Sequence, residues 1–553
     1  MQTSYTSRDR VNFNNQSIHY CIIIVVCFFA FFINNHIIPA DLMESRNLAT
    51  AQEMIREGNY LTPTMNGELR LEKPPLPTWI AAGIEIISPD NLIAQRCAAG
   101  VIATLMVIFL YLLVSRITRN CYMGLIMSLI LATSFNVILM ARTATWDIYC
   151  HSFMLGAIYF FVRAFDTKGA QWGNFIIAGV FMGLSFLSKG PVSFYALLLP
   201  FLLSYGIICR PNTKGKVWPL VLMVFICLII SFWWFGYNFL FHREMLLHVA
   251  DKESTAWVNH NVRPIYYYWK FPAEAGIWAL FWVTSIVFFF FRKCRRRFKR
   301  EYQFFFIWFL LSLIFLSLIP EKKTRYLLPL LIPGAGVIGF YIYYSIQKLA
   351  SKREKIVFGT NAVVIALILL ALPIALYVIF YREGELSLAI LIPTALISWT
   401  LFAFLISSTF GKSGIHPGRI YSSVILCMMM VTSLCLVPIG KMFINDGRDS
   451  IKVLRHNEKV KNLPFYYNNK EELRMELVYE ANQTIRPLSI SDSLLIRKSV
   501  PFVFVSGMSI DSLFADSPVE IDHIDTFDNN WRKQGHKRYN WNLVREVAII
   551  KAK

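Results

Sequence analysis

The sequence predicts a polytopic α-helical membrane protein that ends in a small soluble α/β domain. Hydrophobic residues make up 56% of its 553 residues, and the mean hydropathy is +0.47. Apolar runs close to the length of about 20 residues that crosses a bilayer recur as far as residue 440. Beyond that point, short apolar runs such as Pro501–Ser506 are separated by polar segments, a pattern typical of strands and short helices. We therefore expect a transmembrane domain over residues 1–440 and a soluble domain over residues 441–553.

The transmembrane domain is predicted to contain about thirteen helices, counted as apolar runs of sufficient length. The first run follows Arg8 and Arg10 and has no small-residue cleavage site, so we expect a retained signal anchor. The expected spans lie near residues 18–36, 93–115, 121–140, 148–165, 172–188, 191–209, 217–238, 275–291, 302–319, 326–346, 356–381, 386–409 and 419–440.

The basic residues predict which loops share a side of the membrane. The formal net charge is +20, but Lys and Arg fall in short clusters between the spans. This pattern indicates membrane topology and contact with anionic lipid, and we expect no nucleic-acid partner. If the N-terminus is cytoplasmic, every inner loop is basic, as the positive-inside rule requires. The first loop, residues 37–92, and the C-terminal domain then lie on the outer face. The ten cysteines show neither a disulfide framework nor metal-ligand spacing.

The first outer loop concentrates charged side chains next to the membrane. Asp41 and Arg46 follow the first apolar run, and Glu72-Lys73 precede two prolines that stiffen the entry into the next helix. A carboxylate and an ammonium fixed at a membrane interface suit a substrate with a lipid tail and a phosphate head. We therefore expect the chemistry here, with Arg46 and Lys73 among the phosphate-binding residues. An alternative role for Asp41 is to cap a helix over Met43–Glu57.

Two further outer segments carry charge at the edge of a span, where burial of charge is costly and indicates function. The motif RTATWD, residues 142–147, places Arg142 about one helical turn before Asp147. We expect Asp147 and Arg142 to belong to a functional site, with Arg142 in contact with substrate, and the alternative is an interfacial ion pair between them. Lys189 breaks an apolar hairpin before Gly190-Pro191, and either anchors the chain at the interface or binds phosphate.

The segment 321–326 has three cations in four positions on the outer face, against the positive-inside bias. We expect Lys322, Lys323 and Arg325, with the adjacent Tyr326, to contact a phosphate group. A solvated loop is the alternative.

His260 lies in a polar outer segment and is either solvated or, with a carboxylate from the first loop, part of a metal site.

The order of these motifs resembles that of the bacterial aminoarabinose lipid A transferases and, more broadly, membrane glycosyltransferases of the GT-C fold, which include the protein O-mannosyltransferases. The motifs are the early outer Asp41, the EKPP sequence from Glu72, the RTATWD motif, Lys189-Gly190-Pro191 and the KTRYLLP sequence from Lys323. The EKPP sequence with Met65-Asn66-Gly67 before it is the most specific. Two departures are Leu42, where the family commonly has Glu directly after the acid, and the additional Arg325.

The resemblance implies a GT-C fold of about 13 transmembrane helices with a periplasmic C-terminal domain in the bacterial inner membrane. It implies that Asp41 and Asp147 are catalytic, that Glu72 and His260 contact a divalent metal ion, and that Lys73 contacts lipid phosphate. The family transfers a sugar with inversion from a polyprenyl (undecaprenyl) phosphate donor to an envelope acceptor. We expect the acceptor to be a lipid A phosphate and the sugar to be 4-amino-4-deoxy-L-arabinose, with no nucleotide cofactor and a monomeric enzyme in contact with membrane lipid.

Three alternatives stay open at this point. One is a protein or glycan O-glycosyltransferase of the O-mannosyltransferase type. Another is a transporter of lipid-linked sugars, which would place charges at mid-bilayer and contain paired half-repeats; the sequence has neither feature. The third is a non-catalytic sensor whose outer α/β domain binds a ligand.

Overall fold

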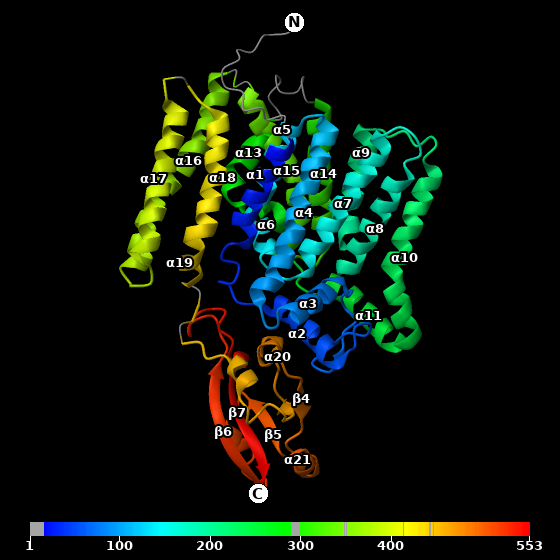
Figure 1. Ribbon diagram of the computed structural model, residues 1–553, viewed down its shortest axis with the longest axis vertical. Helices are drawn as coiled ribbons and strands as arrows, with labels where there is room; N and C mark the ends of the chain where they lie inside the picture. The colour runs from blue at the N-terminus through cyan, green and yellow to red at the C-terminus, as the bar shows by residue number, and fades with distance from the viewer. Residues whose placement is uncertain are drawn as a thin grey trace.

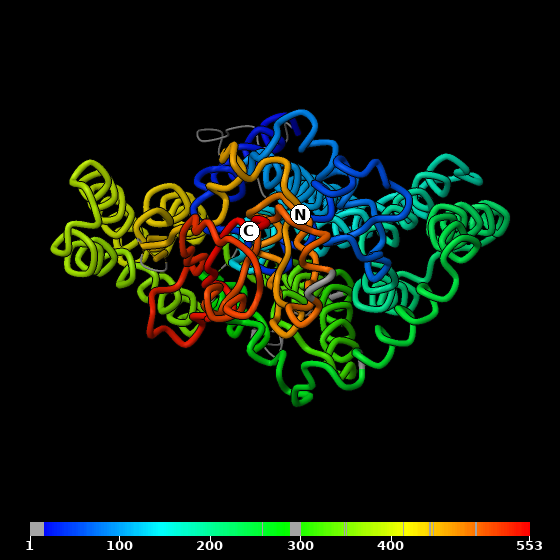
Figure 2. The backbone as a smooth tube through the Cα atoms, turned by 90° about the horizontal axis from the view of Figure 1, so that it is seen from below, coloured from blue at the N-terminus to red at the C-terminus, as the bar shows by residue number. Residues whose placement is uncertain are grey.

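The computed structural model describes residues 16–288, 299–347, 349, 351–412, 414–441, 444, 445 and 447–553. A broad bundle of helices carries the C-terminal domain at one end (Figure 1). We call this end the domain face and the other end the opposite face. Seen from the domain face, the C-terminal domain covers the middle of the bundle and leaves its two sides uncovered (Figure 2).

Among the described residues, nine helices are long and apolar enough to cross a membrane, and a bent pair adds a tenth. The nine are α4 (Leu92–Thr118), α7 (Trp146–Asp166), α8 (Trp172–Lys189), α10 (Val217–Phe241), α14 (Lys299–Leu318), α15 (Leu328–Gln347) with the turn η6 (Thr324–Leu327), α16 (Lys352–Leu376) with η7 (Tyr377–Tyr381), α17 (Leu388–Phe410), and α18 (Pro417–Met430) with η8 (Val431–Cys435) and α19 (Leu436–Lys441).

The bent pair consists of α5 (Cys121–Ala132) and α6 (Phe135–Ala141), which meet at 69°. Two hydroxyls satisfy backbone carbonyls at the break: Thr133 Oγ1 donates to Leu129 O at 2.6 Å and Ser134 Oγ to Ile130 O at 2.7 Å. Such local bonds let a helix turn sharply inside an apolar environment. The bend brings the end of α6 to the domain face.

Three predicted spans are shorter helices than expected. They are α1 (Gln16–Cys27) with the π-helical turn η1 (Phe28–Phe32), η2 (Phe194–Leu198) with α9 (Leu199–Ile208), and η4 (Gly276–Trp278) with α13 (Ala279–Phe288). All thirteen predicted spans therefore have an apolar helix, and the prediction of a polytopic helical fold is confirmed.

The centre of the bundle is α15, which is buried along nearly all of its length. A Cβ atom at Gly334 would lie 2.3 Å from the Trp282 ring, and one at Gly336 would lie 2.3 Å from the Phe305 ring. Glycine therefore allows α13 and α14 to approach this helix closely, as small residues do in membrane bundles.

Short elements between the spans build the domain face. The loop over residues 37–92, which we call the first outer loop after its predicted side, contains α2 (Leu42–Glu57), the two-stranded sheet of β1 (Thr64–Met65) and β2 (Glu68–Leu69), and α3 (Leu76–Ile87). Later segments of the domain face are α11 (Arg243–Asn259), η3 (Ile265–Lys270) and α12 (Phe271–Glu274).

The C-terminal domain is built around a five-stranded sheet of order β4-β3-β5-β7-β6. Strand β3 is parallel to β4 and β5, and β7 is antiparallel to β5 and β6. Its elements are η9 (Ile451–His456), β3 (Phe465–Asn468), α20 (Met475–Ala481), β4 (Ile485–Leu488), α21 (Ser493–Ser499), β5 (Phe502–Ser506), α22 (Ile510–Leu513), β6 (Val519–Asp528), η10 (Trp541–Leu543) and β7 (Val544–Ala552). The predicted α/β character of this domain is confirmed.

The two faces of the sheet pack against different partners, because side chains alternate along a strand. Phe502 and Phe504 of β5 lie in an apolar cluster internal to the C-terminal domain. Val503 and Val505 belong to a second cluster, which also includes Leu48 of α2 in the first outer loop. The domain and the first outer loop are therefore joined by shared hydrophobic packing.

Candidate functional site

The RTATWD segment, residues 142–147, connects α6 to α7 at the domain face and is anchored by side chains from several other elements. Its first residue, Arg142, donates hydrogen bonds to Ala30 O at 2.8 Å, Ile33 O at 2.7 Å and Phe29 O at 3.3 Å. The last carbonyls of a helix lack partners within the helix, so Arg142 caps the end of the first span. The alternative of an ion pair between Arg142 and Asp147 is not what the structure shows, because each residue has a different partner.

A second anchor is the buried ion pair between Glu44 of α2 and Arg96 of α4. Arg96 donates from Nε to Glu44 Oε1 at 2.8 Å and from Nη2 to Oε2 at 2.6 Å. Glu44 Oε1 also accepts the Ala144 N–H at 2.9 Å. Arg96 Nη1 donates to the carbonyls of Asn35 and Ile38 at 2.6 and 2.5 Å. This pair escaped sequence analysis, although an arginine near the start of an apolar span is a recognisable signal.

The third anchor comes from α2, α3 and the loop between them. Asn47 Nδ2 donates to Ala144 O at 2.9 Å, and Thr78 Oγ1 donates to Asn47 Oδ1 at 2.7 Å. Arg70 lies over the Trp146 ring with its guanidinium carbon 5.0 Å from the ring centroid. Burial lowers the pKa of Arg70 to about 10, still high enough for a positive charge at neutral pH.

Asp147 is fully buried and forms an ion pair with Lys189, which ends α8. The Lys189 ammonium also lies 4.7 Å from the centroid of the Tyr326 ring. The structure therefore brings together three predicted site residues that are far apart in the sequence. Lys189 is not an anchor that reaches toward solvent, because its side chain is buried and its ammonium faces Asp147.

Among the described residues, this cluster contains buried polar atoms that have no hydrogen-bond partner. They are Asp147 Oδ2, both ring nitrogens of His151, one helical turn further along α7, and the Trp146 indole N–H. Unsatisfied buried polar groups are rare, and they mark a place where water or a ligand completes the bonding. Sequence analysis missed His151, whose position within a span was the available signal.

Arg325 adds a further positive charge to the cluster. It lies close enough to Asp147 and Lys189 for their charges to interact. In the described part of the chain, its half-buried guanidinium makes no hydrogen bond or ion pair. A guanidinium with unused donors is well suited to bind phosphate.

The two lysines before Arg325 already contact neighbouring protein groups. Lys322 is buried and its ammonium donates to Ile319 O at 2.5 Å and Arg263 O at 3.2 Å. Lys323 pairs with Glu321 at 2.5 Å. The alternative of a solvated loop therefore fails for Lys322. Counting contacts among the described residues, Lys322 and Lys323 have hydrogen-bond partners and the Arg325 side chain has none.

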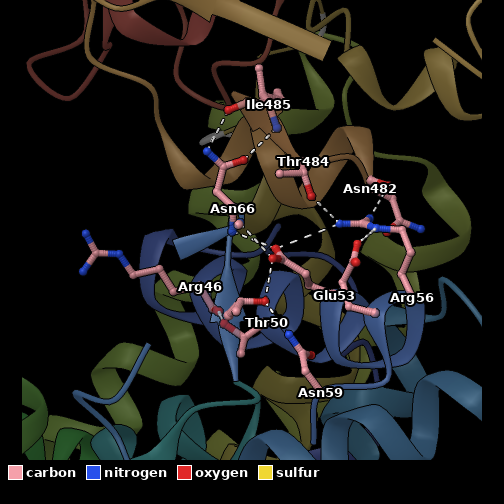
Figure 3. A network of polar contacts seen from close by, with 12 residues as sticks. Arg46, Thr50, Glu53, Arg56, Asn59, Asn66, Asn482, Thr484 and Ile485 are labelled. Atoms are coloured by element: carbon pink, nitrogen blue, oxygen red, sulfur yellow. Dashed lines mark hydrogen bonds and ion pairs between the residues drawn. The ribbon is translucent and has the colours of Figure 1, made fainter. Parts of the chain in front are cut away.

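Asp41 and Arg46 lie at the start of α2. Asp41 is the N-cap residue: its Oδ1 accepts the N–H groups of Met43 at 3.0 Å and Glu44 at 2.8 Å. Within the described residues, its exposed Oδ2 accepts no hydrogen bond. The Nε of Arg46 is buried and has no hydrogen-bond partner in the part of the chain that the structure describes. Figure 3 shows the Arg46 side chain pointing away from the polar network of the first loop.

The Glu72-Lys73 pair faces α11. Lys73 pairs with Glu253 at 3.0 Å, and Glu72 with Lys252 at 3.4 Å, so each residue meets the opposite charge on that helix. His260 is the exposed residue that ends α11. Among the described residues, neither Glu72 nor His260 belongs to a group of three metal-ligating side chains. A metal site at these two residues stays a prediction.

The C-terminal domain is held on the first outer loop by a polar network (Figure 3). Glu53 accepts hydrogen bonds from Asn66 N at 2.7 Å and Gly67 N at 2.8 Å, which fixes the β1–β2 turn. The Asn66 side chain then bonds both the N–H and the carbonyl of Ile485 at 2.7 Å. Arg56 donates to Thr484 Oγ1 at 2.6 Å. The turn before the EKPP sequence is thus pinned to strand β4.

Comparison with known proteins agrees with this architecture. The family model of dolichyl-phosphate-mannose-protein mannosyltransferases matches residues 72–235. The crystal structure of ArnT from Cupriavidus metallidurans bound to undecaprenyl phosphate has a similar fold, with a TM-score of 0.70 over 98% of each chain and 16% sequence identity. The chain is a membrane protein of the GT-C glycosyltransferase fold. The predicted resemblance and fold are thereby confirmed.

The relatives found by sequence are distant. An uncharacterized protein of Aquifex aeolicus (strain VF5) is 29% identical over 375 residues, which cover 66% of this chain and 70% of the relative. An undecaprenyl phosphate-alpha-4-amino-4-deoxy-L-arabinose arabinosyl transferase of Pseudomonas fluorescens (strain Pf0-1) is 27% identical over 314 residues, which cover 54% of this chain. The match spans about half the length of that transferase, 52%.

Proposed function

We propose that the protein transfers a sugar from a polyprenyl phosphate donor to an acceptor at the domain face, and that this face is the periplasmic side of a bacterial inner membrane. The observation that carries the proposal is the incomplete ion pair of Asp147 and Lys189, with Arg325 beside it. A carboxylate oxygen without a partner and a guanidinium with unused donors form a site for a ligand that has both hydroxyl or amino groups and a phosphate.

In the proposed reaction, an acceptor oxygen attacks the anomeric carbon while the bond from that carbon to the phosphate oxygen breaks, so the configuration inverts. Negative charge grows on the leaving phosphate. Arg325, Lys189 and, when it leaves Glu253, Lys73 would stabilise that charge from fixed positions. Asp147 would hold the sugar. Asp41, with Oδ2 directed to solvent, would orient the acceptor or remove its proton if the acceptor is a hydroxyl.

The names of the relatives support a proposal for the sugar. Several curated relatives are named as transferases of 4-amino-4-deoxy-L-arabinose from undecaprenyl phosphate. We propose the same sugar here, with a lipid A phosphate as acceptor. An anionic phosphate needs no strong base, which suits a site whose acids are capped or paired. A divalent ion held by Glu72 and His260 stays a prediction, and no step of this mechanism uses one.

A second candidate is O-glycosylation of a protein or glycan hydroxyl. The observation that favours it is the family match over residues 72–235, which contains both the EKPP and the RTATWD motifs. With a hydroxyl acceptor, Asp41 would act as general base.

The test uses membranes from cells with and without the protein, supplied with lipid extract that contains radiolabelled polyprenyl phosphate sugars. We expect label to move to lipid A in the presence of the full chain and not of the Asp147→Asn variant. Label in protein or in a polymer would support the second candidate. The absence of any transfer that depends on the protein would reject both.

A further inference from the structure

The opposite face of the bundle contains a cavity of about 290 Å³ between α4, α7, α9 and α14. Figure 1 shows the ends of these helices at the far end from the C-terminal domain. The cavity therefore has no part in the site described above.

Four arginines from three separate segments line this cavity: Arg116 and Arg119 at the end of α4, Arg210 after α9, and Arg300 at the start of α14. The two acids on the wall are Asp166 and Glu301. Four positive charges against two negative charges leave a surplus of two.

Each guanidinium has five N–H donors, and the contacts among the described residues use only some of them. Asp166 forms ion pairs with Arg116, whose Nε lies 3.0 Å away, and with the Nη2 atom of Arg119. Arg116 Nη2 donates a hydrogen bond to Thr167 Oγ1 at 2.8 Å. Arg300 donates from Nε to Ile208 O at 3.1 Å and from Nη2 to Cys209 O at 3.0 Å, which caps the end of α9. In the part of the chain that the structure describes, the Arg210 side chain makes no hydrogen bond or ion pair.

Aromatic and aliphatic side chains make up most of the remaining wall. They include Phe165, Phe304 and Tyr205, with Asn212 as a further polar residue. The positive-inside rule explains why basic residues gather on this face, but not why four of them share a cavity with these aromatic side chains. A cavity wall that combines guanidinium groups with apolar side chains matches a phosphate group attached to a lipid tail.

We propose that this cavity binds the phosphate group of an anionic ligand, with a lipid headgroup of the adjacent leaflet as the source. Guanidinium groups bind phosphate oxygens in pairs, and Arg119 and Arg210 keep donors for this. The binding is independent of the sugar-transfer reaction and of its proposed site.

The experiment measures lipid binding to the purified full chain by native mass spectrometry, titrated with phosphatidylglycerol, with phosphatidylcholine and with inorganic phosphate. The test variant combines Arg119→Gln with Arg300→Gln. The matched control combines Arg163→Gln with Arg353→Gln, two exposed arginines of the same face that do not line the cavity. We expect phosphatidylglycerol affinity to fall about tenfold or more in the test variant and to stay within about twofold in the control.

The three probes distinguish a lipid headgroup from a soluble anion as the source of the bound phosphate group. Binding of phosphatidylglycerol that millimolar phosphate does not displace supports the lipid, and displacement by phosphate assigns the cavity to a soluble anion. An equal effect of the test and control variants would overturn the proposal, because it would mean general attraction to the charged face. Since Arg300 also caps α9, the single variant Arg119→Gln is measured beside it and should lower the affinity in the same direction.

Discussion

Two buried ion pairs, Glu44–Arg96 and Asp147–Lys189, lie next to the RTATWD segment but differ in how completely their polar atoms are used. Both Glu44 oxygens accept hydrogen bonds, and Arg96 donates to two backbone carbonyls in addition. Asp147 has one buried oxygen that finds no partner among the described residues, and the Lys189 ammonium also lies over the Tyr326 ring. The first pair is complete, whereas the second has bonding capacity left for a ligand.

The type of cation reinforces this difference. Arginine stays charged in proteins, so Arg96 without its carboxylate would be an uncompensated buried charge. A buried lysine can release its proton and become neutral. The Glu44–Arg96 pair is thus suited to stabilise the fold, whereas the Asp147–Lys189 pair can exchange a protein contact for a ligand.

The largest effect expected is on stability. Glu44→Gln removes the charge opposite Arg96 and should destabilise the protein by about 3–5 kcal/mol. Thermal unfolding in detergent measures this, with Glu57→Gln, an exposed acid of the same helix, as the control that should cost less than about 1 kcal/mol. If the Glu44 variant melts like the wild type, the pair has no structural role.

Asp147→Asn should insert and melt within a few degrees of the wild type, because Lys189 can become neutral. Sugar transfer should fall by about 10²–10⁴-fold. Initial rates with labelled donor measure this. If Asp147→Asn is as strongly destabilised as Glu44→Gln, both ion pairs stabilise the fold and the distinction between them is wrong.

The cations of the 321–326 segment offer a comparison of the same kind. Arg325→Gln should reduce transfer by about 10²–10³-fold, because an electrostatic contact to the leaving phosphate is lost. Lys323→Gln should stay within a few-fold of the wild type, since its ammonium is paired with Glu321. Rates at limiting donor test both. Equal losses would assign phosphate binding to the loop as a whole.

Asp41 combines a structural and a proposed chemical role in one carboxylate. Asn caps a helix about as well as Asp, so Asp41→Asn should keep its melting temperature. It should transfer about one hundredth as much sugar, because it loses the negative charge and the ability to act as a base. Near-normal transfer would leave Asp41 as a helix cap only.

The smallest expected effect is on the contact between the C-terminal domain and the loop after α3. In this contact the partly exposed Asp90 pairs with Lys452 and Arg455. Burial raises the pKa of Asp90, but its interactions with Lys452 and Arg455 lower it more, so its pKa lies below its usual value. The contribution to stability is therefore present above about pH 4 and is lost as the pH falls through the lowered pKa. Limited proteolysis between the domains should increase below about pH 4. At pH 7, Asp90→Asn should already show part of that increase, and resistance equal to that of the wild type would contradict the role of Asp90.

The sequence by itself determined the helical architecture, the C-terminal α/β domain and the resemblance to GT-C enzymes. Apolar length and loop charge are local properties, and the EKPP and RTATWD motifs are contiguous, so no tertiary contact is needed to read them. Most residues of the buried cluster were also among the predicted site residues.

Only the tertiary structure decided which of these residues meet. Packing of α7 against α8 and of both near η6 joins Asp147 to Lys189 and Tyr326, whereas Arg142 turns to the first span. The tertiary structure also revealed the pair of Glu44 with Arg96, and a buried His151 whose ring nitrogens have no hydrogen-bond partner within the described residues. Ion pairing depends on which helices pack side by side and on how deeply a side chain is buried, and neither property is a sum over neighbouring residues. The same packing determined which charges are already neutralised and which remain for a ligand.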